Sequence, residues 1–459
     1  MPKMGLLAGM EITTDAGPAV LGRRVGAAFV CSLGGTAFGY DLGALSGATR
    51  GLAHAFSLTP GLLGFTVSIS LWGAVCASLI AGRFADRLGR RSLLGGSAFL
   101  YMLTSLALAA PVAWPWTGVA ALRLAAGTSI GGFVVGCPLY LAEIAPRLLR
   151  GRFVGLFQLQ IGVGVLLAFA ASAVVAQFVT ETEAWKWCFG LGAAPALCLL
   201  ALMHWLPEVP HWLDRHGWPC DAERSAERLG LAPEEWTGGN GAAEPAAGLE
   251  RLFQRKYLRL VLLATSVALF NQLCGVTILR VYLLDLLSGS GMGHLTSHLC
   301  ALAVSCLNLV TLGLGMLLVD RVGRRPLLAS GSAGMAICLC ALGLAAGRHA
   351  GILFYLGILV AYNTFFSFSQ GAAAWVYLSE LFPFEVRGRG QGYGALVHWV
   401  TNAGLIGVFP LLQAVAPTGC FELLAVLMAA QVAIVLKWYP ETKGARLGEM
   451  ADPEHAVSR

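Results

Sequence analysis

Charge is what this sequence has least of. Only 12% of its 459 residues are charged, whereas 57% are hydrophobic and the mean hydropathy is +0.70. A soluble domain places charge on about a quarter of its residues to keep its surface solvated. This composition therefore excludes an ordinary soluble protein and indicates a chain most of whose surface faces lipid.

Signatures of several other functions are also missing. The pattern GxxxxGK[ST], which holds nucleotide phosphates, does not occur, and this disfavours ATP-driven transport. The 12 cysteines are scattered through apolar stretches without metal-ligand spacing, so Cys31, Cys76, Cys306 and Cys338 are interpreted as small packing residues. No nucleophile–base pair suggests an enzyme, and we expect neither a metal nor a cofactor.

The formal net charge of +6 does not indicate a nucleic-acid partner, because the basic residues are spread over short loops and form no single patch. Residues 1–22 carry Glu11 and Asp15 ahead of the first apolar run, so we expect no cleavable signal peptide. The first apolar segment is then expected to target the chain to the membrane.

The apolar residues fall into long runs separated by short polar loops. At about 20 residues per crossing, these runs predict twelve membrane-spanning helices. A backbone in lipid must satisfy its hydrogen bonds internally, and the runs lack the alternating polarity of a membrane β-barrel. The predicted spans lie near 25–47, 60–81, 92–110, 117–142, 153–176, 187–206, 257–285, 297–319, 326–347, 351–379, 389–412 and 420–438.

Three motifs occur twice, which predicts two homologous halves. They are the 82–91 and 319–325 loops, Glu143 with Arg150 and Glu380 with Arg387, and Pro207-Glu208 and Pro440-Glu441. The copies are roughly 235 residues apart in each case, as in the internal repeats of secondary transporters. We therefore predict an all-α membrane protein with six-helix bundles at 1–206 and 257–459 and a cytoplasmic linker of short helices at 207–256.

The basic residues also predict the orientation. With both termini in the cytoplasm, Arg50, Lys186 and Arg348 are the only lysines and arginines in external loops, and Arg123 and Arg280 lie within spans. An excess of Lys and Arg is typical of cytoplasmic loops. We therefore expect a multi-pass protein of the cell membrane, embedded in the lipid bilayer as a monomer, with both termini cytoplasmic.

Acidic and basic residues at the cytoplasmic helix ends are expected to control access. Ion pairs between neighbouring bundles would hold the cytoplasmic side shut and separate when it opens. Each exposed pair contributes ~0–1 kcal/mol, but several together can bias a two-state equilibrium. Topology signals and ordinary loop solvation are the alternative interpretation. The predicted gating residues are Asp86, Arg87, Arg90, Glu143, Arg150, Glu208, Asp320, Arg321, Arg325, Glu380, Arg387 and Glu441.

Asp41 lies deep within the first predicted span, where an ionised carboxylate is costly and indicates a function. Arg123, inside the fourth predicted span, is its natural partner. An acid that gains and loses an arginine partner as the halves move can bind and release a proton. The pair is therefore predicted to couple transport to protons. The alternative is a static ion pair that only fixes the two helices.

Together these motifs resemble those of the sugar porter family of the major facilitator superfamily, over essentially the whole chain. The resemblance rests on the 82–91 and 319–325 loops, PLYLAEIAP at 138–146 with Arg150-Gly151, PEVPHWL at 207–213, SELFP at 379–383 with Arg387-Gly388, and PETK at 440–443. It implies twelve helices, alternating access and a monosaccharide or polyol as the solute. Because proton-coupled members carry an Asp and an Arg at the positions of Asp41 and Arg123, it also implies symport.

The resemblance further implies which residues contact the solute. Amides donate and accept hydrogen bonds as sugar hydroxyls do, and an indole face packs on the C–H surface of a pyranose. The implied positions are Gln158, Asn271, Gln272, Thr277, Asn308, Trp375, His398, Trp399 and Asn402.

The chain departs from the family pattern at some of these positions. The run NQLCGVT at 271–277 replaces the usual QQxxGIN, and GAAAW at 371–375 lacks the usual proline pair. Arg280 occupies a normally neutral position, roughly 60° around an ideal helix from Thr277. It extends either toward Asp285 and the membrane interface or into the cavity. In the second case the solute carries a carboxylate, as a sugar acid or a quinate-like compound does.

The leading prediction is a secondary transporter that moves a monosaccharide or related polyol with a proton. Transport of a sugar acid or organic acid on the same fold is an alternative, and Arg280 distinguishes the two. A uniporter and a non-transporting sugar sensor are further alternatives. The sensor is disfavoured, because sensors of this fold tend to have a long cytoplasmic tail and only a short segment follows the last predicted span.

Overall fold

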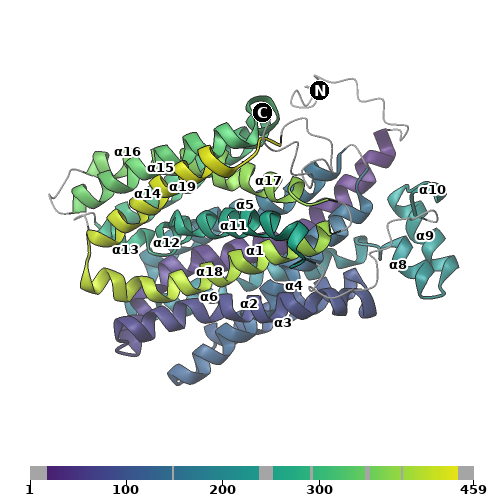
Figure 1. The fold of residues 1–459 in the computed structure, drawn as a ribbon. Coiled ribbons are helices and arrows are strands. Elements are labelled where there is room, and N and C mark those ends of the chain that lie inside the picture. The colour runs from purple at the N-terminus through teal and green to yellow at the C-terminus, as the bar shows by residue number, and fades with distance from the viewer. Residues whose placement is uncertain are drawn as a thin grey trace, which may run out of the picture.

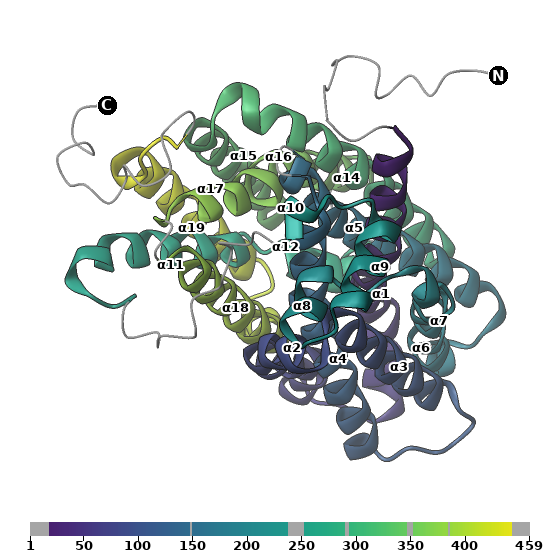
Figure 2. The same cartoon turned by 90° about the vertical axis from the view of Figure 1, so that its right-hand side faces the viewer.

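A computed structural model describes residues 18–146, 149–236, 252–289, 293–346, 352–383 and 386–442. Within these residues all regular secondary structure is helical. Figures 1 and 2 show a bundle of long helices with short helices beyond one end. We call this end the linker end and the opposite one the far end. The short helices are α8 (Pro210–Arg215), α9 (Pro219–Leu229) and α10 (Pro233–Trp236).

The second helix of the first half begins at residues that favour a helix start. Thr59 caps the second helix by accepting a hydrogen bond from the backbone N–H of Leu62, and Pro60 occupies the first turn, where a missing N–H costs nothing. The half consists of α1 (Pro18–Ala55), α2 (Pro60–Leu88), α3 (Arg90–Ala109), α4 (Trp116–Ile144), α5 (Arg150–Phe178), α6 (Glu181–Gly190) and α7 (Ala193–Leu202).

The second half has the same number of spans but more breaks. Its helices are α11 (Leu258–Leu273), α12 (Val276–Val281), α13 (Leu283–Gly289), α14 (His294–Val322), α15 (Arg324–Ala346), α16 (Ile352–Phe368), α17 (Ala374–Glu380), α18 (Arg387–Val415) and α19 (Gly419–Trp438). Between α11 and α12, Gly275 has φ +83°, a left-handed conformation that glycine adopts without a steric penalty. The seventh span is therefore a broken helix.

Eleven stretches in the described residues are long and apolar enough to cross a membrane. The one predicted span that is missing from these eleven is the tenth, which consists of α16 and α17 joined by a π-helical turn at Ser369–Ala373. In that turn the backbone carbonyl of Gln370 accepts a hydrogen bond from the side chain of Asn271 at 2.8 Å, and such an inserted donor is a recognised cause of a helix irregularity. With this interrupted span, the predicted all-α fold of twelve spans is confirmed.

The halves touch through a few helices. In the first half α1 packs on α5 and α2 on α4, while in the second α15 packs on α19 and α11 on α18. Between the halves α2 packs on α18, α5 on α14, and α1 on α12 and α13. The helix α1 is therefore central, because it contacts both its own half and the broken seventh span.

The linker helices dock on the start of α1. Arg24 is buried and donates to Glu235 Oε2 at 2.7 Å and to the backbone carbonyl of Gly230 at 2.7 Å. The predicted short helices of the linker are thus present as α8, α9 and α10, attached to the first half. Residues 237–251 of the linker, and both chain termini whose side of the membrane was predicted, lie outside the described residues.

Candidate functional site

The centre of the first half holds a buried ion pair. Arg123 on α4 donates to both carboxylate oxygens of Asp41 on α1, at 2.5 Å from Nη1 to Oδ1 and 3.1 Å from Nη2 to Oδ2. The side chains of Arg123 and Asp41 are only 1% and 2% exposed. The structure therefore brings these two predicted residues into direct contact, with the two parallel bonds that suit guanidinium and carboxylate groups.

The arginine of this pair has other contacts. Its Nη2 also donates to Ser70 Oγ at 2.7 Å, and its guanidinium lies over the Phe189 ring, 4.4 Å from the centroid. The Tyr101 hydroxyl donates to Asp41 Oδ1 at 3.4 Å. Arg123 therefore has a hydrogen bond and an aromatic face in addition to its carboxylate partner.

A polar cluster lies in the second half, next to the break in the seventh span. Gln272 contacts His398 Nε2 at 3.1 Å and Asn271 Oδ1 at 3.2 Å through its Nε2, and its Oε1 accepts from Thr277 Oγ1 at 2.9 Å. These four side chains are buried. Four of the predicted solute contacts thus form one group, composed of α11, α12 and α18 residues, that presents both donors and acceptors.

The cluster extends to residues that sequence reasoning missed. Asn271 is bonded to the backbone carbonyl of Gln370, whose own amide donates to Gln431 Oε1 at 2.9 Å. Ser332 donates to the same oxygen at 2.9 Å. Both residues could have been identified from the sequence, because Gln370 and Gln431 are polar amides inside apolar runs.

Aromatic rings cover one side of the cluster. Trp375 and His398 lie with ring centroids 4.8 Å apart, and His398 and Trp399 with centroids 5.2 Å apart. Trp399 also packs against Phe38 of α1 at 5.3 Å. The two predicted tryptophans therefore flank the histidine, and one of them connects the cluster to the first half.

Among the described residues, no hydrogen bond joins the remaining predicted contacts to this group. Asn308 on α14 donates to Asn363 Oδ1 on α16 at 2.7 Å. Asn402 is buried on α18, and its Oδ1 has no hydrogen-bond partner among the described residues. Gln158 is half-buried on α5, and two residues later Gln160, which was not predicted, accepts a hydrogen bond from Thr36 at 2.8 Å.

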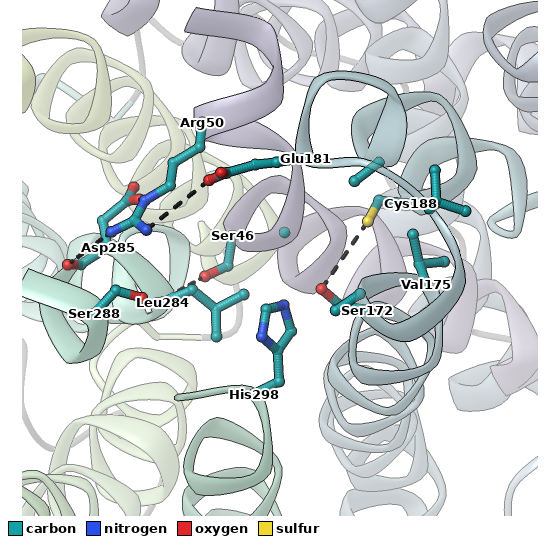
Figure 3. A pocket seen from close by; sticks show the side chains of 14 residues that line it. Ser46, Arg50, Ser172, Val175, Glu181, Cys188, Leu284, Asp285, Ser288 and His298 are labelled. Atoms are coloured by element: carbon teal, nitrogen blue, oxygen red, sulfur yellow. Dashed lines mark hydrogen bonds and ion pairs between the residues drawn. The ribbon is translucent and has the colours of Figure 1, made fainter. Parts of the chain in front are cut away.

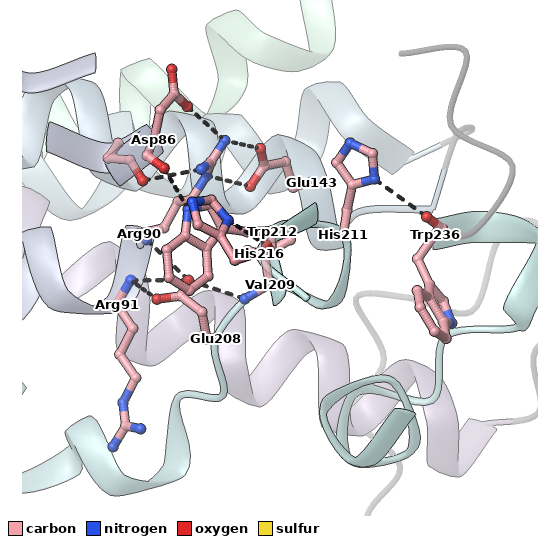
Figure 4. Close-up of polar contacts among 11 residues, drawn as sticks. Asp86, Arg90, Arg91, Glu143, Glu208, Val209, His211, Trp212, His216 and Trp236 are labelled. Carbon is pink, nitrogen blue, oxygen red and sulfur yellow. Dashed lines mark hydrogen bonds and ion pairs between the residues drawn. The ribbon is translucent and has the colours of Figure 1, made fainter. Parts of the chain in front are cut away.

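An acid–base cluster closes the linker end of the first half (Figure 4). Arg90, at the start of α3, donates to Glu143 Oε2 at 3.1 Å and to Oε1 at 3.0 Å, and contacts Asp86 Oδ1 at 3.2 Å. Glu208 accepts from the backbone N–H groups of Arg90 and Arg91 at 3.0 Å each. The first turn of α3 is therefore held by an acid from the segment that follows the sixth span.

The second half repeats this arrangement with different residues. Arg324 donates to Glu380 at 2.8 and 3.1 Å, and Glu441 accepts from the backbone N–H groups of Arg324 and Arg325 at 3.0 Å each. Arg324 was not among the predicted residues. The repeat could have identified it, because Arg324 occupies the position in the 319–325 loop that Arg90 occupies in the 82–91 loop.

These contacts correct the predicted pairing. Glu143 and Glu380 were paired with Arg150 and Arg387 and were expected to join neighbouring bundles. Glu143 is instead bonded to Arg90, the residue that begins α3, and Glu380 is bonded to Arg324, which begins α15; the side chain of Arg387 lies outside the described part of the structure. Among the described residues, the ion pairs of each cluster therefore lie within one half.

The other predicted gating residues also lie at helix ends. Arg87 and Arg150 are exposed, and neither forms an ion pair with another described residue. Arg325 donates to the backbone carbonyl of Leu436 at 2.5 Å, and Arg321 is exposed. The side chains of Asp320 and Arg387 lie outside the described part of the structure.

The environment of Glu208 changes its acidity. Burial raises the pKa of Glu208 above its ordinary value, and the backbone N–H groups of Val209, Arg91 and Arg90 offset only part of this increase. Glu208 follows the membrane-spanning residues of the sixth span. It is therefore a group at the linker end that takes up a proton at a higher pH than an exposed glutamate.

At the far end an ion pair joins the two halves. Asp285 on α13 accepts from Arg50 Nε at 2.6 Å and from Thr49 Oγ1 at 2.9 Å, and the backbone N–H of Leu284 donates to Ser46 Oγ at 3.2 Å. Figure 3 shows Arg50 between Asp285 and Glu181 at the rim of a small pocket. We call Thr49, Arg50 and Asp285 the far-end clasp.

Arg280 on α12 is the second arginine inside a span. Its guanidinium lies over the Phe366 ring of α16, 5.4 Å from the centroid. No ion pair joins Arg280 to Asp285 among the described residues, and that carboxylate is bonded to Arg50 of α1.

Comparison with known proteins identifies the family of this chain. A family model described as "Sugar (and other) transporter" matches residues 27–452. The chain belongs to the sugar porter family of the major facilitator superfamily. As a sugar porter it is a multi-pass membrane transporter and not an enzyme.

Relatives and solved structures agree with this membership. The glucose transporter GlcP of Staphylococcus epidermidis is 30% identical over 91% of this chain and 94% of its own. The D-xylose-proton symporter of Escherichia coli is 28% identical over 92% of this chain and 94% of its own. A structure of the inward open conformation of the xylose transporter XylE from E. coli superimposes with a TM-score of 0.81, at 25% identity, covering 93% of this sugar porter and 99% of XylE.

Proposed function

We propose that this sugar porter moves a monosaccharide or related polyol across the cell membrane together with a proton, by alternating access. The buried ion pair of Asp41 and Arg123 carries the proposal. A carboxylate with one bidentate cationic partner and almost no exposure is costly to leave charged and unpaired, so its protonation must accompany any separation of the pair. The relative described as a D-xylose-proton symporter supports the same choice.

The contacts of α1 suggest how a proton and a solute are coupled. Asp41 lies three residues after Phe38 on α1, hence on nearly the same face, and Phe38 packs against Trp399 beside the polar cluster. A shift of α1 that accompanies protonation of Asp41 therefore alters the aromatic wall of the solute site. Conversely, a solute seated against Trp399 changes the cost of that shift.

The orientation of this conformation follows from charge. The linker end carries the basic loops, and the positive-inside rule assigns such loops to the cytoplasm. At the far end the clasp joins α1 to α13, whereas the acid–base clusters of the linker end each lie within one half. We therefore interpret the structure as a state closed to the exterior, with both termini and the linker cytoplasmic.

Uptake into proteoliposomes tests the proposal. Purified protein would be reconstituted, and accumulation of labelled monosaccharides and polyols would be measured with and without an inward proton gradient. We expect at least one solute to accumulate against its gradient only when the proton gradient is present, and the accumulation to be abolished by a protonophore. Equilibration that is insensitive to the proton gradient would point to a uniporter. Saturable binding of a sugar without any flux would point to a sensor.

A further inference from the structure

Arg280 is a permanent cation inside the membrane whose guanidinium has neither an ion pair nor a hydrogen bond within the described residues. Its contact there is the face of Phe366. The acid closest to it in the sequence, Asp285, is bonded to Arg50 and Thr49 of α1. An arginine in a span is costly unless it meets an opposite charge or water. The charge of Arg280 therefore requires a partner that the described chain does not provide.

The position of Arg280 on α12 points to the solute site. Arg280 follows Thr277 by three residues, which places it one helical turn farther along nearly the same face, about 4.5 Å along the axis. Thr277 belongs to the polar cluster through its hydrogen bond to Gln272. The other residues of α12, including Leu279 and Val281, are buried, whereas Arg280 is partly exposed. The cation thus forms the next layer of the same site.

The helix opposite Arg280 carries groups that suit a hydroxylated solute. Phe366 lies on α16 three residues after Asn363, so the two side chains are neighbours on that helix. Asn363 accepts a hydrogen bond from Asn308 of α14. A molecule with hydroxyls for these amides and a carboxylate for the guanidinium would satisfy every one of these groups, since carboxylate and guanidinium form paired, charge-assisted bonds.

We infer that Arg280 is an anion-binding subsite of the transport site and that the solute is an acidic monosaccharide, a uronate or an aldonate. The inference rests on the proposed function, whose polar cluster supplies the hydroxyl contacts. It has an electrical consequence, because one proton carried with one monoanion moves no net charge. A proton carried with a neutral sugar moves one positive charge.

Competition with the wild-type protein is the first test. Uptake of a labelled neutral sugar would be measured against unlabelled glucose, glucuronate and gluconate, and against chloride at the same concentration. We expect one of the acids to compete about tenfold or more better than the neutral sugar, the effect of one charge-assisted hydrogen bond. We also expect uptake of the labelled acid to be unaffected by an imposed membrane potential.

Arg280→Leu is the matched variant, and Arg259→Leu, an exposed arginine at the start of α11, is its control. Arg280→Leu should lower the preference for the acid over the neutral sugar by about tenfold, measured as the ratio of the two competition strengths in the same variant. Arg280→Lys should retain part of the preference, and Arg259→Leu all of it. If Arg280→Leu fails to fold, the competition and membrane-potential measurements on the wild-type protein still test whether the solute is an acid.

The outcomes separate the two proposals. Proton-driven uptake of neutral sugars, with no preference for acids and no effect of Arg280→Leu on selectivity, would overturn the anion subsite and leave the proposed function intact. Uptake that depends on chloride through Arg280 would assign the cation to an inorganic anion and also overturn the inference. Absence of proton-driven flux with any solute, neutral or acidic, would instead overturn the proposed function.

Discussion

The carboxylate of Asp41 and the guanidinium of Arg123 meet at 2.5 Å in the interior of one half, yet the two groups are not equally supported. Arg123 retains Ser70 Oγ at 2.7 Å and the ring of Phe189 if the carboxylate is neutralised. Without Arg123, Asp41 keeps only a long contact of 3.4 Å with the Tyr101 hydroxyl. Loss of the carboxylate charge would therefore leave Arg123 with other contacts, whereas loss of the guanidinium would leave Asp41 without a close partner.

Asp41→Asn should separate coupling from exchange. Asparagine keeps the shape and hydrogen-bonding ability of the side chain but cannot bind a transported proton. Uptake driven by a proton gradient should collapse, while counterflow of solute, which needs no net proton movement, should largely persist. Glu183→Gln, at an exposed acid of α6, is the control. Undiminished proton-driven accumulation by Asp41→Asn would leave a facilitator with a structural ion pair.

The unequal support of the pair predicts unequal losses of stability. Arg123→Leu leaves a buried carboxylate without its cation and should lower the free energy of unfolding by about 3–5 kcal/mol. Asp41→Asn should cost less, because Ser70 and Phe189 still hold the arginine. The double variant should be more stable than Arg123→Leu alone. Thermal unfolding in detergent measures all three, and equal losses for the two single variants would contradict this order.

Gly89 and Gly323 should each be required at the linker end. Their φ angles are +92° and +105°, and a Cβ on either would meet the carboxylate of Glu208 or Glu441. Replacement by alanine therefore combines backbone strain of about 1–3 kcal/mol with displacement of the capping acid. Gly82→Ala is the control, because nothing lies within 4 Å of a Cβ there. If Gly82→Ala lowered the melting temperature as much as Gly89→Ala, the capping geometry would not matter.

The sequence sufficed for features that depend on composition and local pattern. Long uncharged runs predicted the spans, and a charge inside a run singled out Asp41 and Arg123. It did not suffice where partners are chosen in space. Glu143 was assigned to Arg150 because that arginine is near in the chain, but helix packing presents it to Arg90 across a loop. Only the fold determines such a choice.

Irregular backbone was the second feature that could not be predicted from the sequence. The tenth span reads as one apolar run, yet it contains the π turn at Ser369–Ala373 that receives the side chain of Asn271. Hydropathy carries no information on an inserted hydrogen bond between distant helices. For the same reason Gln370 and Gln431 were overlooked, since their importance lies in bonding to each other and to the polar cluster.

The raised pKa of Glu208 predicts a pH dependence of stability. Burial favours its protonated form in the folded state, so the fold binds a proton more tightly than the unfolded chain does. The stability that Glu208 contributes is therefore present below its ordinary pKa and is lost as the pH rises through the raised value. The effect is at most about 1.4 kcal/mol per pH unit. Glu208→Gln stays neutral at every pH, so the wild type should lose stability relative to this variant as the pH rises from 4.5 to 7.5, and a stability difference that stays constant over this range would argue against the shift.

The far-end clasp predicts how the two access states are balanced. Arg50 and Asp285 belong to different halves, so their contact at 2.6 Å must break whenever the far end opens. The side chains are 38% and 24% exposed, so the pair is expected to contribute only ~1 kcal/mol. A shift of that size changes the ratio of the two states about fivefold. Removing the clasp should therefore favour the state that is open at the far end.

Reactivity of Cys188 reports on this shift, because the thiol is buried and lines the pocket beneath the clasp (Figure 3). Labelling would be read by mass spectrometry of its peptide, since other cysteines are exposed. Asp285→Asn should raise the fraction of Cys188 labelled by several-fold, and exchanging the charges, Arg50→Asp with Asp285→Arg, should restore part of the protection. Glu181→Gln is the control: this exposed acid lies 4.0 Å from Arg50 but in the same half, so its removal leaves the halves joined. Labelling that rose equally in Glu181→Gln and Asp285→Asn would mean that local charge, and not the joining of the halves, governs access to the thiol.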